Sequence, residues 1–430
     1  MLEFTSNPIS FACVCILALF ISITLYKSFT SKSYYEFWSP LTFVCLVYLY
    51  YVIVNPINFA LQGRVDFLGL NLISAADSAW LGAFLSFFSL WFGFRIYHKK
   101  ISKTSLFNFQ LPSSKLPKAG LILFGLGLAF WVYTRGFQLN VFAVDNDREF
   151  VTGGLSMYFV NGISFFIAAV SFLFLNYLKR RNTKYFLWFI IPLLLVIITY
   201  LTQGSRFRLV YLVIALATVF YLYRKRRPNP ILWLGFGIGF YLLMGVIEVT
   251  RNYSRGLDLT KLEQYSVEDI SNNASNESRV FFFSGEVINT VSDTNSYIYF
   301  EPVYTAILMP IPRVFFPWKP DAEYLNDIQL QILGTDATGA AFLNYAEYYY
   351  AFGWFGILFF SFIMGVLLKY FWCNYLQNKE NLLAIVSLGL INGLVYVLIS
   401  RGYMAQQFFS YMYFIVIPLW LAKKMKIKIT

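Results

Sequence analysis

The sequence predicts an all-α polytopic membrane protein, and three observations support this prediction. The chain of 430 residues is 58% hydrophobic and 21% aromatic but only 13% charged, which is far from the composition of a soluble globular protein. Many apolar runs reach or approach the ~20 residues that a helix needs to cross a bilayer. The cationic residues cluster in short loops between these runs. Because backbone inside lipid must satisfy its own hydrogen bonds, runs this long and continuous indicate helices.

The pattern predicts about eleven transmembrane helices, and counts of ten to twelve are consistent with it. The expected spans are 8–26, 38–58, 77–97, 119–135, 155–178, 185–202, 208–223, 230–249, 349–370, 382–400 and 405–422. The first run lacks a basic segment before it and a small-residue cleavage site after it, which favours a retained span over a signal peptide. The four cysteines lie in or beside apolar runs without metal-ligand spacing, so a disulfide framework is not expected.

The basic loops indicate how the chain is oriented. They are the connection 98–118, KRRNTK at 179–184, RKRRPN at 224–229 and the tail KKMKIK at 423–428. They fall on alternate connections and therefore share one face, which the excess of Lys and Arg assigns to the cytoplasm. The net charge of +12 is thus explained by topology and not by binding to nucleic acid. This orientation places the N-terminus outside and the C-terminus in the cytoplasm.

One connection is much longer than the others and divides the chain into three parts. We expect transmembrane helices over 1–249, a large extracytoplasmic loop over 250–348, and transmembrane helices with a basic tail over 349–430. The loop carries thirteen acidic residues against six basic ones. Loops longer than ~12–15 residues are uncommon unless they are functional or disordered. Apolar stretches at 280–289 and 302–309 predict short helices on the membrane surface.

The stretch PIPRVFFPWKP, from Pro310 to Pro320, is the strongest site signal in the chain. Its prolines exclude a helix interior and fix the backbone, so Arg313 and Lys319 sit on a rigid segment beside aromatic rings. Arginine binds phosphate bidentately, and lysine binds it as a point charge. The segment therefore fits an anionic, lipid-linked ligand, and the alternative is snorkelling of both cations beneath an aromatic belt.

Other arginines lie at predicted outer ends of spans. Arg206, in TQGSRFR, follows a glycine and a serine that permit close approach of a ligand. Arg401 lies in the short turn ISRGY and is a candidate to form a cationic cluster with Arg206. Arg251 and Arg255, in IEVTRNYSRG, are a possible phosphate clamp oriented by Glu248. The alternatives are interfacial anchoring and simple pairing of Glu248 with an arginine at a helix end.

Two carboxylates complete the candidates. Glu301, in FEPVY, precedes the proline-rich stretch, and Glu347, in NYAEYYYAFGWFG, opens a span among tyrosines. Each is a candidate general base or sugar-hydroxyl ligand, whereas the alternative for Glu347 is an aromatic belt. The only histidine, His98, lies in a cytoplasmic loop. The sequence therefore contains no His/Cys metal site, Ser-His-Asp triad or nucleotide-binding glycine loop.

These motifs resemble those of bacterial oligosaccharide repeat-unit polymerases, the Wzy O-antigen polymerase type. GSRFRLVYL at 204–212 resembles the Gly-Ser-Arg turn and following span of that family. EPVYTAILMPIPRVFFPWKP at 301–320 resembles its outer-loop segment, and FGWFGILFFSFIMGVLLKYF at 352–371 resembles the next span. The hydropathy pattern is similar along most of the chain. The chain departs from the family in its span count and in its outside N-terminus, since members commonly show more spans and an inside N-terminus.

The resemblance implies a GT-C-like membrane glycosyltransferase architecture in the bacterial inner membrane. It implies that undecaprenyl-diphosphate-linked oligosaccharides are joined at the periplasmic face to make O-antigen or a similar surface polysaccharide. No nucleotide sugar, metal or other cofactor is required in that reaction. Membrane lipids are expected partners, and a chain-length regulator protein is a further candidate.

The resemblance also implies roles for the candidate residues. Arginines that bind the diphosphate leaving group more strongly as its charge develops would stabilise the transition state. The candidates for this role are Arg206, Arg251 and Arg313, supported by Arg255, Lys319 and Arg401. Glu301 and Glu347 are candidates for the base that activates the acceptor hydroxyl, and the sequence does not choose between them.

Three other functions are compatible with the composition. An O-antigen ligase resembles the polymerases in shape but carries a histidine in its large loop, and residues 250–348 contain none. A flippase or transporter of the lipid-linked oligosaccharide often shows two related halves, which this sequence lacks. A non-catalytic scaffold or chain-length partner does not explain arginines close to the hydrocarbon. Polymerase is the favoured function.

Overall fold

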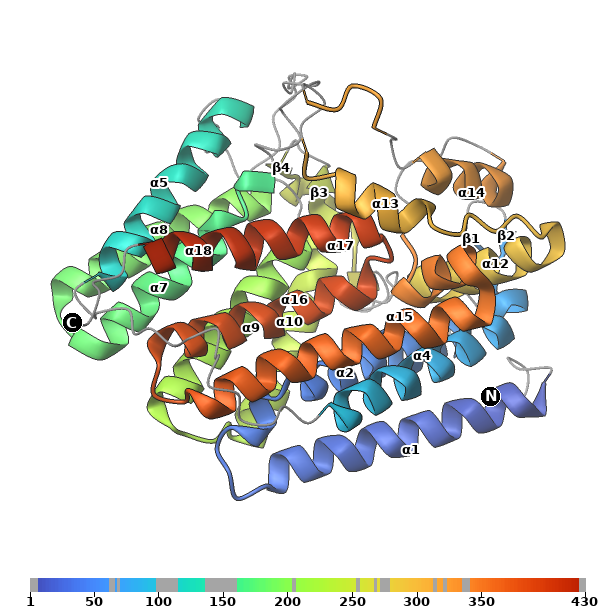
Figure 1. Ribbon diagram of the computed structural model, residues 1–430, viewed down its shortest axis with the longest axis horizontal. Coiled ribbons are helices and arrows are strands. Elements are labelled where there is room, and N and C mark those ends of the chain that lie inside the picture. The colour runs from blue at the N-terminus through green and yellow to red at the C-terminus, as the bar shows by residue number, and fades with distance from the viewer. Residues whose placement is uncertain are drawn as a thin grey trace.

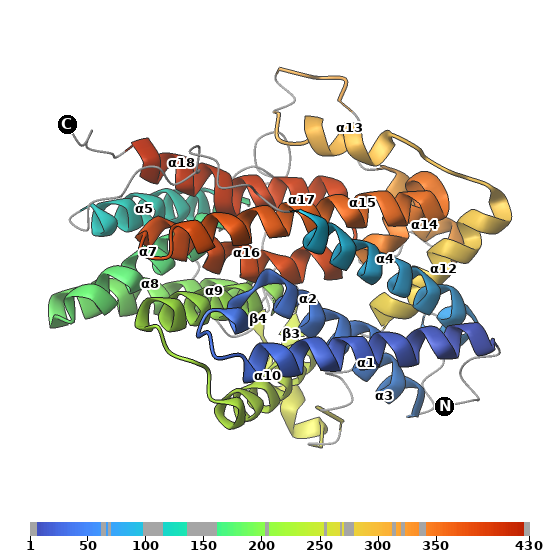
Figure 2. The ribbon, with the colours of Figure 1, turned by 60° about the horizontal axis from the view of Figure 1, so that its bottom comes forward.

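The structure is a computed structural model that describes residues 7–61, 66–67, 70–97, 115–135, 161–202, 206–252, 256–266, 269–270, 279–311, 315–319, 323–334 and 341–424. Its long helices run side by side along the longest axis of the molecule (Figure 1). The same arrangement is visible after rotation, where α13 lies outside the bundle (Figure 2).

The N-terminal part consists almost entirely of long apolar helices. Its helices are α1 (Pro8–Thr30), α2 (Pro40–Tyr48), α3 (Asn55–Leu61), α4 (Ala76–Ile96), α5 (Leu116–Arg135), α7 (Phe165–Arg180), α8 (Thr183–Thr202), α9 (Arg206–Arg224) and α10 (Pro230–Thr250). Short 3-10 helices η1 (Glu36–Trp38) and η3 (Leu72–Ala75) precede α2 and α4, and a π-helical turn, η2 (Leu49–Val54), joins α2 to α3. A two-residue hairpin, β1 (Asp66–Phe67) with β2 (Leu70–Asn71), lies before η3.

The long loop contains several short elements. They are the hairpin β3 (Arg251–Asn252) with β4 (Gly256–Leu257), the 3-10 helix η4 (Leu259–Gln264), and the helices α12 (Arg279–Thr294), α13 (Glu301–Leu308) and α14 (Glu323–Leu333). The two helices predicted at 280–289 and 302–309 are therefore present as α12 and α13.

Helix α12 differs from the expected membrane-surface helix. Its apolar side chains, Phe281, Phe282 and Phe283 among them, are buried. Gly285 lies so close to Ala75 that an added Cβ would overlap the Ala75 carbonyl. The apolar face of α12 is already covered by α4 and α15, so it is not available to lipid.

The C-terminal part contains α15 (Asn344–Gln377), α16 (Leu382–Ser400), α17 (Met404–Tyr411), a π-helical turn η6 (Met412–Val416) and α18 (Ile417–Lys424). Helix α15 begins before the predicted span start at 349 and is broken at Phe352 and Gly353, where Gly353 has φ +61°. The N–H groups of Ile298 and Tyr299 donate to the carbonyls of Tyr350 and Ala351 (3.1 and 3.0 Å). These bonds satisfy carbonyls that the break leaves outside the helical ladder.

Ten of the described helices or helix combinations are long and apolar enough to cross a membrane. They correspond to ten of the eleven predicted spans, and the predicted all-α polytopic membrane class is confirmed. The remaining span, 155–178, overlaps α7 (Phe165–Arg180), and its residues 155–160 lie outside the described part of the chain. Helix α1 begins at one end of the bundle and α18 ends at the other (Figures 1 and 2), as an odd number of crossings requires.

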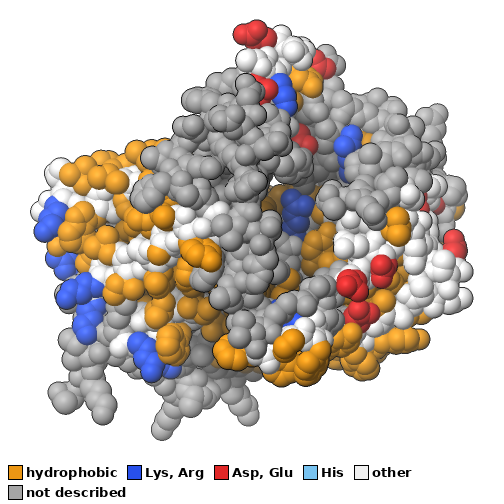
Figure 3. All heavy atoms as spheres, turned by 90° about the horizontal axis from the view of Figure 1, so that it is seen from above, with side chains coloured by type: hydrophobic (Ala, Val, Ile, Leu, Met, Phe, Trp, Pro, Cys, Tyr) orange, Lys and Arg blue, Asp and Glu red, His pale blue; other side chains and the backbone are white. Residues whose placement is uncertain are grey.

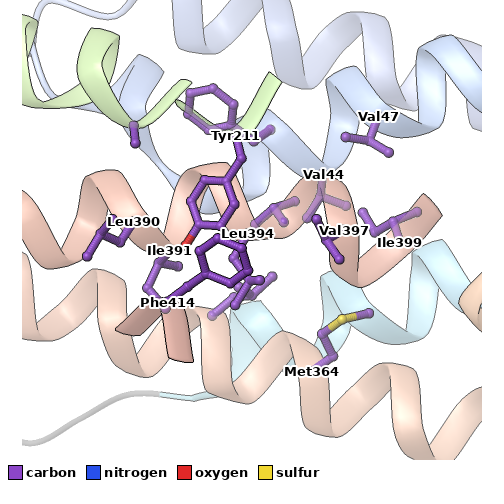
Figure 4. Packing of buried hydrophobic residues seen from close by; sticks show 14 of the residues in the cluster. Val44, Val47, Tyr211, Met364, Leu390, Ile391, Leu394, Val397, Ile399 and Phe414 are labelled. Atoms are coloured by element: carbon purple, nitrogen blue, oxygen red, sulfur yellow. The ribbon is translucent and has the colours of Figure 1, made fainter. Parts of the chain in front are cut away.

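Helix α16 is the centre of the core. Its side chains are buried along most of its length and pack against α2, α9 and η6 (Figure 4). The rings of Tyr211 and Phe414 meet on one side of it, with centroids 4.5 Å apart. Gly393 faces Tyr211, and a Cβ there would overlap that ring. Small residues allow this close helix approach, which provides the packing that replaces hydrophobic attraction inside a membrane.

Candidate functional site

The two ends of the bundle differ in charge. Lys and Arg side chains gather at one end, and Asp and Glu gather at the other (Figure 3). At the basic end, Lys225 pairs with Glu380 (2.6 Å), and Arg227 donates to the backbone carbonyl of Lys32. The basic loop 224–229 thus contacts two other connections at this end of the bundle. Helix α9 ends at Arg224 beside this basic end, and the opposite end of the helix, at Arg206, lies close to the end of α16.

Two arginines converge on one ring at that opposite end. The guanidinium carbon of Arg208 lies 5.5 Å from the centre of the Phe207 ring, and that of Arg401 lies 5.8 Å from it. Arg208 is only 8% exposed and also lies 5.7 Å from the ring of Tyr200. Arg206 is the first residue of α9, although its side chain lies outside the described part. The structure therefore brings Arg401 to the start of α9, as the predicted cluster with Arg206 requires.

The turn that carries Arg401 is held by three hydrogen bonds to its backbone. The N–H of Gly402 donates to the carbonyl of Phe342 (2.7 Å). A Cβ at Gly402 would lie 2.6 Å from the Phe342 ring and 2.7 Å from its carbonyl oxygen, so only glycine fits. The side-chain amide of Gln407 donates to the carbonyls of Leu398 (2.8 Å) and Arg401 (3.0 Å). The backbone of Arg401 is thus fixed from both sides.

Glu347 lies under this turn and is fully buried. Its Oε1 accepts a hydrogen bond from the Tyr324 hydroxyl (2.7 Å), and its Oε2 accepts one from the N–H of Met404 (2.6 Å). Tyr324 belongs to α14 and Met404 to α17, so one carboxylate joins three elements. Both of its oxygens already have protein donors.

Glu301, at the start of α13, is partly exposed. Burial raises the pKa of this carboxyl above its ordinary value, and the neighbouring Asp327 and Glu323 raise it further. A carboxyl whose pKa is raised toward neutrality suits proton transfer at physiological pH. Of the two candidate carboxylates, only Glu301 is accessible to a substrate.

Lys319 makes hydrogen bonds to the backbone of its own stretch. Its ammonium donates to the carbonyls of Met309 (3.0 Å) and Ile311 (3.0 Å), just beyond the C-terminus of α13. The side chain is 8% exposed, whereas Phe315 and Trp318 beside it are each 74% exposed. Where described, the stretch is non-helical as predicted. Lys319 binds the two ends of this stretch together.

The remaining candidates are only partly described. Arg313 and Arg255 lie outside the described residues, and Arg251 is described only as a backbone position in β3. Within the described ranges, no group of three or more His, Cys, Asp or Glu residues is placed to hold a metal ion.

Three residues of this region were not among the predicted site residues. Arg208 had a sequence signal, because it follows Arg206 in the same motif. Tyr324 and Tyr403 had none, because their roles depend on contacts between distant segments. Tyr403 adjoins the Arg401 turn, where burial raises the pKa of its hydroxyl to about 12.

A comparison with protein families gives the family of the chain. A family model described as O-antigen polysaccharide polymerase Wzy matches residues 1–429. The chain belongs to the Wzy O-antigen polymerase family. No curated protein and no solved structure matches it. Membership supports polymerisation of O-antigen repeat units by a multi-pass membrane protein, and it favours polymerase over ligase and transporter.

In this Wzy family member, Arg208 and Arg401 lie beside Phe207 at the start of α9. Glu301, whose pKa is raised, lies at the start of α13 in the long loop, and α13 contacts α17, the helix that follows the Arg401 turn.

Proposed function

We propose that the protein joins undecaprenyl-diphosphate-linked oligosaccharides at the periplasmic face of the inner membrane. A hydroxyl oxygen of the incoming unit forms a bond to the anomeric carbon at the lipid-linked end of the growing chain. The bond from that carbon to the diphosphate breaks, and undecaprenyl diphosphate leaves with the electron pair. The hydroxyl proton passes to a base. No nucleotide sugar takes part.

The convergence of Arg208 and Arg401 on Phe207 is the observation that carries this proposal. Both guanidinium groups lie beside the same ring, and a diphosphate bound there accepts charge-assisted hydrogen bonds from both. The N-terminus of α9 adds a partial positive charge at the same place. Arg206 supplies a third cation in the sequence of this turn. These groups bind the leaving group most strongly when its charge is fully developed.

The loop region supplies the remaining roles. Glu301 is the proposed base, because it is accessible and its pKa is raised by burial. Arg313, in the stretch after α13, is proposed to contact the diphosphate as well. Lys319 holds the two ends of this stretch together through the carbonyls of Met309 and Ile311. Arg251 and Arg255 are proposed to support binding from the β3–β4 hairpin. A chain-length regulator protein is a proposed partner.

The charge of the two ends supports the proposed orientation. The loops that meet around Lys225 and Glu380 are basic, and an excess of Lys and Arg is typical of cytoplasmic loops. The arginine site lies at the opposite end and is therefore proposed to face the periplasm. The tail after α18 follows the basic end and is proposed to be cytoplasmic.

The experiment is complementation of a strain that lacks the gene, read as a surface-glycan ladder on a silver-stained gel. In the deletion strain, a single repeat unit on lipid A core supports the polymerase function. Polymer that accumulates on undecaprenyl diphosphate indicates a ligase. An unchanged ladder contradicts the polymerase, ligase and flippase functions alike. We expect Arg401→Ala and Arg208→Ala to lose long polymer. Arg180→Ala is the matched control, since Arg180 stacks on Tyr185 near the basic end (4.9 Å). Normal ladders in both site variants at wild-type protein levels would overturn the proposal.

A further inference from the structure

Glu347 occupies a position that neither lipid contact nor direct contact with substrate explains. Its side chain is 0% exposed, and its two oxygens accept hydrogen bonds from separate elements. A carboxylate buried without partners would be very unfavourable, and these two donors compensate its loss of hydration. With both oxygens engaged, it has no free oxygen directed at a substrate hydroxyl.

The first partner of Glu347 is the start of α17. The residue before this helix, Tyr403, makes no side-chain cap hydrogen bond. The N–H groups of a helix start need acceptors from outside the helix, and a negative charge there is favourable. Glu347 supplies both to Met404 at 2.6 Å, so it acts as the cap of α17 from another helix. Arg401 lies three residues before this bond.

The second partner ties the extracytoplasmic helix α14 to the same place. The Tyr324 hydroxyl donates to Glu347 at 2.7 Å, and Tyr324 is 2% exposed. Burial and the neighbouring carboxylate raise the pKa of Tyr324, so its hydroxyl keeps the proton that it donates. Gln329, one turn further along α14, forms a side-chain hydrogen bond with Tyr403. Helix α14 thus contacts the Arg401 turn both directly and through Glu347.

We propose that Glu347 is a positioning residue that joins α14 to the Arg401 turn and so holds the Arg401 guanidinium beside Phe207. This proposal rests on the proposed function, because the purpose of the connection is to position a ligand of the diphosphate. The proposal also gives the two candidate carboxylates different roles. Glu301 accepts the proton of the acceptor hydroxyl, and Glu347 holds the Arg401 turn in place. Tyr324 is the second member of the connection.

The decisive substitution is Glu347→Gln, because glutamine has nearly the same shape. Its carbonyl oxygen accepts from the Met404 N–H, and its amide donates to the Tyr324 oxygen, so both connections are retained without a basic carboxylate. For a positioning role we expect the polymerisation rate of Glu347→Gln to stay within about threefold of wild type, since one neutral bond replaces a charged one. For Glu347→Ala we expect a loss of about 10- to 100-fold, because two buried donors lose their acceptor. Tyr324→Phe should fall between these two.

The alternative roles give different results. A general base would lose about 10²- to 10⁴-fold in both the Gln and the Ala variant, and that outcome would overturn the proposal. Wild-type rates in both variants would overturn it as well. If Glu347→Ala does not fold, Glu347→Gln and Tyr324→Phe still separate the two roles.

Two further measurements separate positioning from general stability and from failure of the proposed function. Hydrogen exchange of the peptide containing Met404 should be slow in wild type and Glu347→Gln and at least about tenfold faster in Glu347→Ala, since the acceptor of that amide is lost. Unchanged exchange in Glu347→Ala would contradict the connection whatever the activity. In rate measurements, Glu347→Ala combined with Arg401→Ala should be no slower than Arg401→Ala alone. If Arg401→Ala itself has the wild-type rate, the proposed function fails, and the exchange result still decides whether the connection exists.

Discussion

Arg401, in the turn after α16, holds its guanidinium carbon 5.8 Å from the centre of the Phe207 ring at the start of α9. A guanidinium beside a ring is oriented by that ring, and its planar fork of N–H donors matches the geometry of a phosphate group. Arg208 approaches the same ring at 5.5 Å. Phe207 therefore sets the spacing of two cations that come from distant parts of the chain.

This relationship predicts that lysine does not replace arginine at Arg401. Lysine keeps the charge but loses the bidentate contact and the stacking on Phe207. We expect Arg401→Lys to reduce kcat by about 10- to 100-fold and Arg401→Ala by more, on the scale of ~2–4 kcal/mol for a lost transition-state donor. Steady-state polymerisation by purified protein in nanodiscs measures both. A wild-type kcat in Arg401→Lys would show that charge alone is sufficient.

Glu301 predicts a pH dependence. Its pKa is raised, so the base becomes active only as the pH rises through that raised value, and the rate should increase on the acidic side of the profile. Glu301→Gln should lower the rate by about 10²- to 10⁴-fold and remove this acidic limb. A Glu301→Gln variant that keeps the limb would assign the proton transfer to another group.

The raised pKa of Glu301 makes the rate increase with pH but makes the folding stability decrease with pH. Between the ordinary glutamate pKa of about 4.3 and the raised value, the folded state binds more protons at Glu301 than the unfolded state does. The contribution of Glu301 to the free energy of unfolding is therefore present at low pH and is lost as the pH rises. The thermal unfolding temperature of Glu301→Gln should therefore decrease less steeply with rising pH than that of the wild-type protein.

Lys319 is predicted to act through the stretch that it closes. Its ammonium binds the carbonyls of Met309 and Ile311, so Lys319→Met should release the segment that carries Arg313. We expect the rates to be non-additive, with Arg313→Ala combined with Lys319→Met about as slow as Arg313→Ala alone. Independent losses that multiply would mean that Lys319 contacts the diphosphate itself.

Gly402 is predicted to tolerate no side chain. An added methyl group would lie 2.6–2.9 Å from Phe342 and Leu343 atoms, so Gly402→Ala should lower the free energy of unfolding by about 1–3 kcal/mol. Gly235→Ala on α10 is the matched control, because its methyl group meets no atom within 4 Å and alanine favours the helix. Chemical or thermal denaturation in detergent compares the two. Equal stability of both variants would contradict the packing at Gly402.

The proposed orientation predicts opposite labelling of the two ends. In a variant that lacks the native cysteines, a cysteine at the exposed Trp318 should react with a membrane-impermeant maleimide in intact spheroplasts. A cysteine at Arg227 should react only after lysis. The reversed pattern would place the arginine site in the cytoplasm and exclude a periplasmic reaction.

Several features of the site could be predicted from short stretches of sequence. TQGSRFR and ISRGY are both short turns on the same predicted face, so a cluster of their arginines was a reasonable expectation, and the structure brings Arg401 to the start of α9. The proline-rich stretch was predicted to be non-helical for a local steric reason. The contacts of Lys319 with the carbonyls of Met309 and Ile311 could not be predicted, because a lysine beside prolines gives no local signal of them.

The sequence by itself determined the class of the protein, the approximate ends of the ten apolar helices that the structure describes, and the separation of charge between the two ends. These properties depend on local composition and on the thickness of a bilayer, which any stretch of chain reveals alone. Only the tertiary structure decided that Glu347 bonds to Tyr324 and Met404, that Arg401 lies on Phe207, and that α12 packs inside the bundle. These pairings depend on how helices far apart in the chain pack together, and helix packing is fixed by the fit of side chains across the whole bundle.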